Sequence, residues 1–271
     1  MAHETNLARA PIWGTDLPRP DPQATVVLPN LYGQAVHHVE GPALTFSDER
    51  LMAEFTTDWM RDGCRVERRI VEFSENAACR ALGYSQTGGR QRTLVKKALR
   101  RLRSSTFEFT GRHPDGSFER RGWGMLNDYY LRSWSEGRGV GWVEISEPIA
   151  RLLAEGSFTY LHQPTWDELR QDDDLAARLW VFLEAEELGE GRRYSVFRPE
   201  GVEADGDARQ LPTIGELLGV ETWALRKKAA DRLRRACRQL MTADPRYVLS
   251  VVSSRDHGMW RLEARRRRLT P

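Results

Sequence analysis

Apolar residues recur at helical spacing in several stretches of the chain, separated by alternating or turn-forming sequence. The first such stretch carries Leu51, Phe55, Trp59 and Met60. Intervals of four residues place Leu51, Phe55 and Trp59 on one face of a helix, with Met60 beside Trp59. Ser47 is predicted to cap this helix and Gly63 to end it.

A compact set of shorter elements follows the first helix. Residues 69–73 read as a strand, and Ser74 is predicted to cap a short helix that stops at Gly83. Residues 93–103 then predict a second amphipathic helix. The alternating aromatic residues of 107–126 surround a Pro-Asp-Gly turn, which predicts a hairpin.

The same order of elements is written a second time. Its parts are DDLAARLWVFLEAEEL, RRYSVFRPE, LPTIGELLG, VETWALRKKAADRLRRACRQL, RYVLSVVSS and GMWRLEARR. Helix, strand, helix, turn, helix and hairpin is the order of a winged helix. The first copy differs in an unusually long turn at 84–91, where an insertion costs little.

The predicted fold class is therefore α+β, with two tandem, pseudo-duplicated winged-helix domains and a proline-rich N-terminal arm. The expected divisions are an extended arm, two winged-helix domains and a basic tail: 1–41, 42–158, 159–264 and 265–271. Apolar anchors in the arm are expected at Trp13 and 26–28. GWVEISEPIARLLAEGSFTYLHQPTW reads as a structured connector, with Ser146 capping a short helix.

The strongest evidence for duplication is a repeated basic segment. LVKKALRRL begins at Leu94 and LRKKAADRL begins at Leu225. In a winged helix, the helix after the turn enters the DNA major groove, which displays the full donor and acceptor code. The side chains predicted to face the core are Leu94, Ala98, Leu99, Leu102, Leu225, Ala229, Leu233 and Leu240.

The polar faces of the two helices supply the candidate DNA contacts. Those predicted from the first helix are Arg90, Arg92, Thr93, Lys96, Lys97, Arg100 and Arg103. Those predicted from the second are Thr222, Trp223, Lys227, Lys228, Asp231, Arg235 and Arg238. A solvated charged face is the plain alternative, but two copies in one structural slot favour DNA binding.

Asp231 interrupts the second basic face and has two interpretations. A carboxylate repels phosphate but accepts a hydrogen bond from a cytosine amino group, which would indicate base readout. It also stands four residues from both Lys227 and Arg235, so an ion pair within the helix is the alternative.

Composition narrows the function classes. The chain has 271 residues and a formal net charge of +2, but its acids crowd 167–174, 184–190 and 200–207, away from the basic helices. Three cysteines without a short spacing predict a reduced, cytoplasmic protein and no zinc motif. No apolar run is long enough for a membrane span, and the N-terminus does not resemble a secretion signal.

Catalytic interpretations find little support. His37 and His38, with Tyr129 and Tyr130, suggest a nicking enzyme with a tyrosine nucleophile, but adjacent histidines on a strand point to opposite faces. The glycine-rich stretches lack the lysine and spacing of a phosphate loop. Neither an enzymatic activity nor a cofactor or metal is expected. The RRRR of 265–268 predicts a nonspecific phosphate contact at best.

Residues 43–265 resemble the plasmid replication initiators with tandem winged helices, the RepA/TrfA-like family. The likeness lies in ENAACRALG, GRQRTLVKKALRRLRSSTFEF, GWVEISEPIARLL and the stretch from LWVFLEAEEL to MTADPRYVLSVV. It implies binding to iterons in a plasmid origin, opening of AT-rich DNA, and contacts with a host initiator and helicase. It also implies that 223–240 is the main reading helix, and that the N-terminal winged helix holds a dimer interface.

Two functions fit these patterns. The first is an origin-binding initiator without catalysis of its own. The second is a transcriptional repressor or partition protein that uses the same fold and leaves the duplex closed. Fold alone does not separate them.

Overall fold

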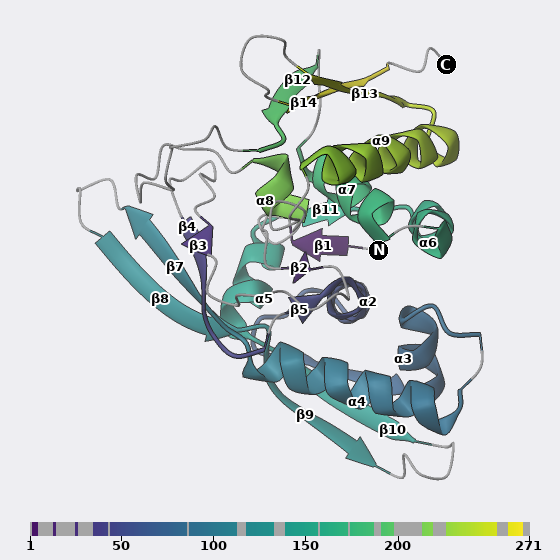
Figure 1. Cartoon of the computed structure of the whole chain (residues 1–271). Helices are drawn as coiled ribbons and strands as arrows, with labels where there is room; N and C mark the ends of the chain where they lie inside the picture. Colours follow the sequence, from purple (N-terminus) through teal and green to yellow (C-terminus); the bar gives the residue numbers. More distant parts are fainter. Residues whose placement is uncertain are drawn as a thin grey trace.

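The computed structural model describes much of the chain and shows a mixed α/β fold with helices and mostly antiparallel sheets (Figure 1). The described residues are 2–4, 13–14, 25–26, 35–42, 44–85, 87–112, 118–132, 139–156, 158–172, 174–186, 191–197, 213–218, 226–253 and 260–267. No helix in these ranges combines the length and apolar character needed to cross a bilayer.

The first unit opens with α2 (Phe46–Arg61), whose cap differs from the prediction. Thr45 is the N-cap, and its backbone N–H donates to the Asp48 carboxylate at 2.7 Å, while its hydroxyl accepts from the Asp48 N–H at 3.4 Å. This reciprocal box requires an acceptor three residues after the cap, which Asp48 supplies for Thr45. Ser47, the predicted cap, instead accepts a hydrogen bond from Arg170 at 2.8 Å.

The next elements are β6 (Ile70–Ser74), α3 (Glu75–Ala81) and α4 (Gly89–Ser104). Ser74 caps α3 as predicted, by accepting from the N–H of Ala77 at 3.1 Å. The α4 helix begins four residues before the predicted start at position 93, so the predicted turn of 84–91 ends at Gly88. Its last three residues, 89–91, extend the helix, which adds backbone hydrogen bonds that a loop would lack.

The hairpin of β7 (Thr106–Arg112) and β8 (Phe118–Gly124) exists, but it does not close the first unit's sheet. It pairs through β7 with β4 (Ala35–Glu40), which pairs with β3 (Thr25–Val26). The three-stranded sheet of the unit has the order β6-β10-β9, from β9 (Leu126–Arg132) and β10 (Val140–Ile145). The predicted connector strand is therefore part of this sheet, because Val143 and Ile145 bury their side chains in the core.

Apart from its first helix, which was not predicted, the second unit follows the predicted order. Its elements are α6 (Gln163–Asp172), α7 (Asp174–Ala185), β12 (Arg192–Ser195), α8 (Ile214–Leu218), α9 (Arg226–Ala243), β13 (Tyr247–Ser253) and β14 (Trp260–Arg266). The sheet order β12-β14-β13 repeats that of β6-β10-β9, with the first strand beside the last. Because β14 continues to Arg266, the predicted tail of 265–271 begins inside the sheet.

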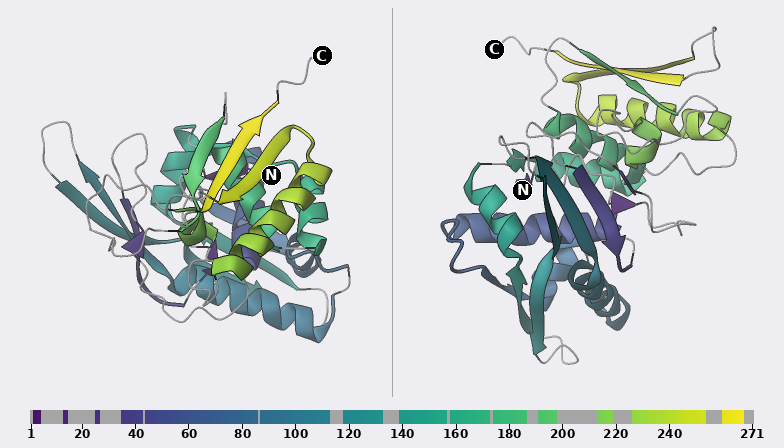
Figure 2. Two further views of the ribbon diagram at one scale, coloured as in Figure 1. Left: turned by 45° about the horizontal axis from the view of Figure 1, so that its top comes forward. Right: turned by 90° about the vertical axis from the view of Figure 1, so that its left-hand side faces the viewer.

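The two units share one hydrophobic core, and short segments join them. After α5 (Glu147–Ala154), β11 (Phe158–Tyr160) pairs with β1 (Ala2–Glu4) at the N-terminus, and β2 (Trp13–Gly14) pairs with β5 (Leu44–Thr45). Figure 2 shows the second unit stacked against α2, with β13 and β14 on the outer side of α9. The N-terminal segment thus includes strands that pair with both ends of the first unit.

Candidate nucleic-acid interface

Helix α4 presents cationic side chains on one face and packs the other. Val95, Ala98, Leu99 and Leu102 are buried, whereas Leu94 is only half-buried, so the apolar face is rotated slightly from the prediction. The predicted contacts that are exposed are Arg90, Thr93, Lys97, Arg100 and Arg103, and Lys96 is half-buried. Among the described residues of this helix no acid interrupts the polar face.

Two arginines of α4 hold the helix in place. Arg101 donates two hydrogen bonds to the Asp48 carboxylate of α2, both at 2.8 Å. Burial raises the pKa of Asp48 even though Arg101 opposes that shift. Arg92 pairs with the buried Glu75 of α3, so it contributes to packing inside the unit rather than standing free for DNA as predicted. Arg103 pairs with Asp128 at 3.3 Å across an exposed surface.

Helix α9 repeats this arrangement. Ala229, Leu233 and Leu240 are buried, as predicted. The exposed side chains are Lys227, Lys228, Asp231, Arg235 and Arg238. The remaining predicted residues at its start, Thr222, Trp223 and the inward Leu225, lie outside the described residues. Both helices therefore carry a solvent-facing cationic surface over an apolar face.

Asp231 forms an ion pair, but with a different partner from either candidate. Its carboxylate accepts from Arg234 at 2.8 Å, three residues along the helix, rather than from Lys227 or Arg235. Arg234 in turn donates to the Val251 carbonyl at 3.4 Å and lies 4.4 Å from the Trp260 ring centre. Arg234 is thus anchored to the sheet and fixes the position of Asp231.

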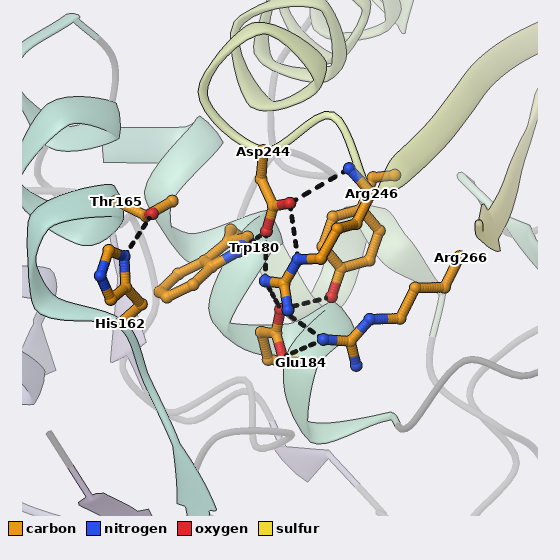
Figure 3. Close-up of polar contacts among 8 residues, drawn as sticks. His162, Thr165, Trp180, Glu184, Asp244, Arg246 and Arg266 are labelled. Atoms are coloured by element: carbon orange, nitrogen blue, oxygen red, sulfur yellow. Dashed lines mark hydrogen bonds and ion pairs between the residues drawn. The ribbon is translucent and has the colours of Figure 1, made fainter. Parts of the chain in front are cut away.

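A polar cluster anchors the C-terminal end of α9 (Figure 3). Asp244 accepts from Trp180 of α7 at 3.1 Å and from Arg246 at 2.8 Å. Glu184 of α7 accepts from Arg246 at 2.7 Å and from the Tyr247 hydroxyl at 2.9 Å. Burial alone would raise the pKa of Asp244, but the hydrogen bonds from Arg246 and Trp180 outweigh it and lower that pKa.

Buried polar links run from one cationic helix to the other. Arg101 joins α4 to Asp48 of α2, and the adjacent Glu49 accepts from Arg178 of α7 at 3.1 Å, with both side chains almost fully buried. Trp180, two residues after Arg178, reaches the end of α9 through Asp244. Figure 1 shows the two helices in the lower and upper halves of the molecule. These links fix their relative position.

The histidines and tyrosines of the nicking-enzyme interpretation lie on strands of different sheets. His37 and His38 lie on β4, whereas Tyr129 and Tyr130 lie on β9 in another sheet. His162 is exposed and shares a hydrogen bond of 2.8 Å with Thr165 (Figure 3). Within the described ranges no three histidines, cysteines or acids come together as metal ligands. Cys64, Cys79 and Cys237 are free thiols.

Sequence reasoning missed three exposed arginines of the strands, Arg132 on β9 and Arg193 and Arg261 on the second sheet; the exposed Arg265, predicted as part of the basic tail, also lies on that sheet. Arg132 lies at the end of β9, which forms a hairpin with β10 and completes the first sheet. The sequence prediction had given this role to the hairpin of residues 107–126. The alternation of apolar and charged residues in WRLEARR is the signal that could have identified the outward positions of β14.

Two solved structures have a fold similar to that of this chain over nearly its whole length. A structure of domains 2 and 3 of RctB matches with a TM-score of 0.58 and 12% identity, covering 97% of this chain and 98% of that one. A second structure of RctB domains 2–3 matches with a TM-score of 0.56 and 9% identity, covering 97% and 96%. No model of a protein family and no curated protein matches the sequence.

Proposed function

We propose that this chain is a sequence-specific, double-stranded-DNA-binding replication initiator without catalysis of its own, and that each unit is a winged helix. Both units contain, in order, a helix, a strand, two helices and two more strands that complete the three-stranded sheet. In both sheets the first strand pairs with the last one. In a winged helix of this order, α4 and α9 would be the groove-reading helices. The resemblance of the sequence to plasmid initiators, and the likeness to two consecutive RctB domains, support the proposal.

One observation carries the DNA-binding proposal: the chain's lysines. They are Lys96, Lys97, Lys227 and Lys228, and the other cations of the chain are arginines. Both adjacent pairs stand at the same place of the repeat, on the exposed or half-exposed face of α4 and α9. A compact ammonium group on a flexible stem is suited to phosphate contact. The restriction of lysine to these two helices supports the same role, phosphate contact, for both.

The finer proposal is binding to iterons at a plasmid origin, followed by origin opening and helicase loading. Two reading helices in one chain would occupy successive major grooves about one helical turn apart, which predicts a footprint of roughly 20 base pairs from one chain. A surface that neutralises about 6 to 10 phosphates releases that many counterions, so binding should weaken steeply with salt.

The distribution of lysines makes a direct test possible. The protein is treated with an amine-acetylating reagent, with and without a duplex containing the repeats found beside its gene, and each lysine is quantified by mass spectrometry. Both pairs should be protected by the specific duplex, while the N-terminal amine, measured in the same samples, serves as the control. Equal acetylation with and without DNA would remove the lysine pairs from the interface.

Origin opening is tested separately from binding. Permanganate footprinting of a supercoiled plasmid that carries the repeats should show unpaired thymines in the neighbouring AT-rich segment. Binding without such thymines would favour the transcriptional repressor or partition protein, which leaves the duplex closed. A covalent tyrosyl–DNA adduct would contradict the proposed lack of catalysis.

A further inference from the structure

The outer faces of the two matching sheets differ in chemistry. The registers of the described strands match positions of one sheet with positions of the other. The matched residues are Ile70 with Arg193, Glu72 with Ser195, Trp142 with Arg261, and Tyr130 with Val252. At these four positions the second face carries two arginines, whereas the first carries apolar residues and Glu72; the exposed Arg132 lies at the end of the first face, opposite Val140. A duplicated surface that exchanges arginines for Ile70 and Trp142 is poorly suited to DNA.

Exposed apolar side chains concentrate on this first sheet. Among the described residues, three of the five large hydrophobic side chains that are strongly exposed lie on it: Ile70 at 49%, Tyr130 at 49% and Val140 at 53%. Tyr130 stacks on Trp142 directly opposite, with ring centres 6.1 Å apart. Contiguous exposed apolar surface of this kind marks interaction sites.

Strand β6 forms an open edge of the same sheet. The Ile145 N–H donates to the Arg69 carbonyl at 3.0 Å, and the Glu75 N–H donates to the Gly139 carbonyl at 2.9 Å. Because antiparallel pairing alternates, every second residue from position 69 bonds to β10. The backbone groups of Ile70, Glu72 and Ser74 are therefore directed away from β10, where they can pair with an added strand.

An acidic groove of about 600 Å³ runs along this edge. The C-terminal end of α2 supplies Asp58, Trp59 and Asp62 to its lining, and the strand side supplies Arg68, Ile70, Val71 and Glu72. Asp58 pairs with Arg61 at 3.0 Å. Asp62 and Glu72 have no ion-pair partner within the described part of the chain. The groove therefore offers free carboxylates on both sides of an unpaired backbone edge.

We propose that this edge binds an extended segment of a partner protein in which Lys or Arg alternates with apolar residues, added to β6 as a further strand. Main-chain hydrogen bonds would supply affinity, and alternate side chains would supply specificity. Side chains on one face meet Ile70 and Glu72, and those on the other enter the groove beside Trp59 and Asp62. The partner's cations match the free carboxylates. This inference does not depend on DNA binding.

The proposal is tested with the full chain and a fluorescein-labelled peptide of alternating Val and Lys, about eight residues long, which is a usual strand length. Fluorescence anisotropy should show saturable binding. The variant carrying Asp62→Lys and Glu72→Lys should bind at least about tenfold more weakly, since like charges oppose association. Ser195→Lys, at the matched position of the other sheet, is the control and should bind normally.

A backbone test separates strand addition from simple charge attraction. Glu72→Pro removes an N–H that faces the open edge, so pairing with β10 is retained while the added strand loses a donor. This variant should lose peptide binding relative to Glu72→Gln, with both showing the circular dichroism of the native protein. Should Glu72→Pro fail to fold, a peptide N-methylated on alternate residues gives the same comparison, because methylation also removes donors.

Three outcomes would overturn the proposal. They are absence of Val–Lys peptide binding, equal binding of a Val–Glu peptide, and self-association of the protein that Asp62→Lys with Glu72→Lys abolishes, which would assign the edge to a second copy. The edge variants should retain native DNA affinity. Failure of lysine protection by DNA, with peptide binding intact, would reject only the proposed DNA function.

Discussion

The ion pair between Glu49 and Arg178 joins α2 of the first unit to α7 of the second, and its removal should reveal what holds the two units together. Both side chains are almost fully buried, with exposures of 1% and 0%, and Arg178 donates to Glu49 at 3.1 Å. Burial lowers the pKa of Arg178, and the charge of Glu49 opposes that shift. Arg178→Met removes the cation that pairs with the buried Glu49 carboxylate, so we expect a loss of about 3 to 5 kcal/mol in the free energy of unfolding.

The double variant and the single variant should differ strongly in their free energy of unfolding. Replacing both residues, as Glu49→Met with Arg178→Met, removes the uncompensated charge and should restore stability to near or above the native value. Arg151 offers a matched control, since it pairs with Glu147 at 2.6 Å on the exposed surface. Arg151→Met should change the free energy of unfolding by less than about 1 kcal/mol.

Urea unfolding followed by circular dichroism and tryptophan fluorescence is measured for the native protein, both single variants Glu49→Met and Arg178→Met, the double variant and Arg151→Met. The double-mutant cycle gives the coupling energy of Glu49 and Arg178 directly. Arg178→Met should also lower DNA affinity, because the link between α2 and α7 fixes the separation of the two reading helices. The reasoning is refuted if Arg178→Met costs no more than Arg151→Met, or if the double variant is as unstable as the single one.

Three further predictions concern helix α9. Replacing Lys227 and Lys228 with Ala should weaken DNA binding and reduce the salt slope by about 2, as measured by anisotropy between about 50 and 200 mM salt; an unchanged slope would exclude both from phosphate contact. Leu233→Ala, at a buried position, should lower the free energy of unfolding by about 2 to 5 kcal/mol, and the half-buried Leu94→Ala by less; equal losses would contradict the assigned faces. Burial raises the pKa of Cys237 from 9.0 to about 12, so the folded state retains this proton and stability is lost as pH rises through that range. The urea concentration at the unfolding midpoint should decrease when the pH is raised from about 8 to about 10.5, and it should decrease less for Cys237→Ala. Equal decreases in both proteins would show that the buried thiol does not contribute.

Several elements were determined by local sequence. Ser74 and Gly83 set the limits of α3, because a side-chain acceptor and a residue with φ of +81° satisfy helix ends without outside help. The cationic faces of α4 and α9 also follow from helical periodicity, which depends only on neighbours along the chain. Thus the repeated order of elements and most outward residues of the candidate interface could be predicted.

Tertiary structure decided the rest, because it depends on partners distant in sequence. Alternation predicts that 107–126 is a hairpin, but it cannot tell which sheet that hairpin joins; only the match between apolar faces placed β9 and β10 beside β6. Likewise, every arginine of α4 is equally basic in the sequence, yet Arg101 is held by Asp48, 53 positions away. Which buried charges pair depends on which helices pack together in the core, and the local sequence pattern does not specify that packing.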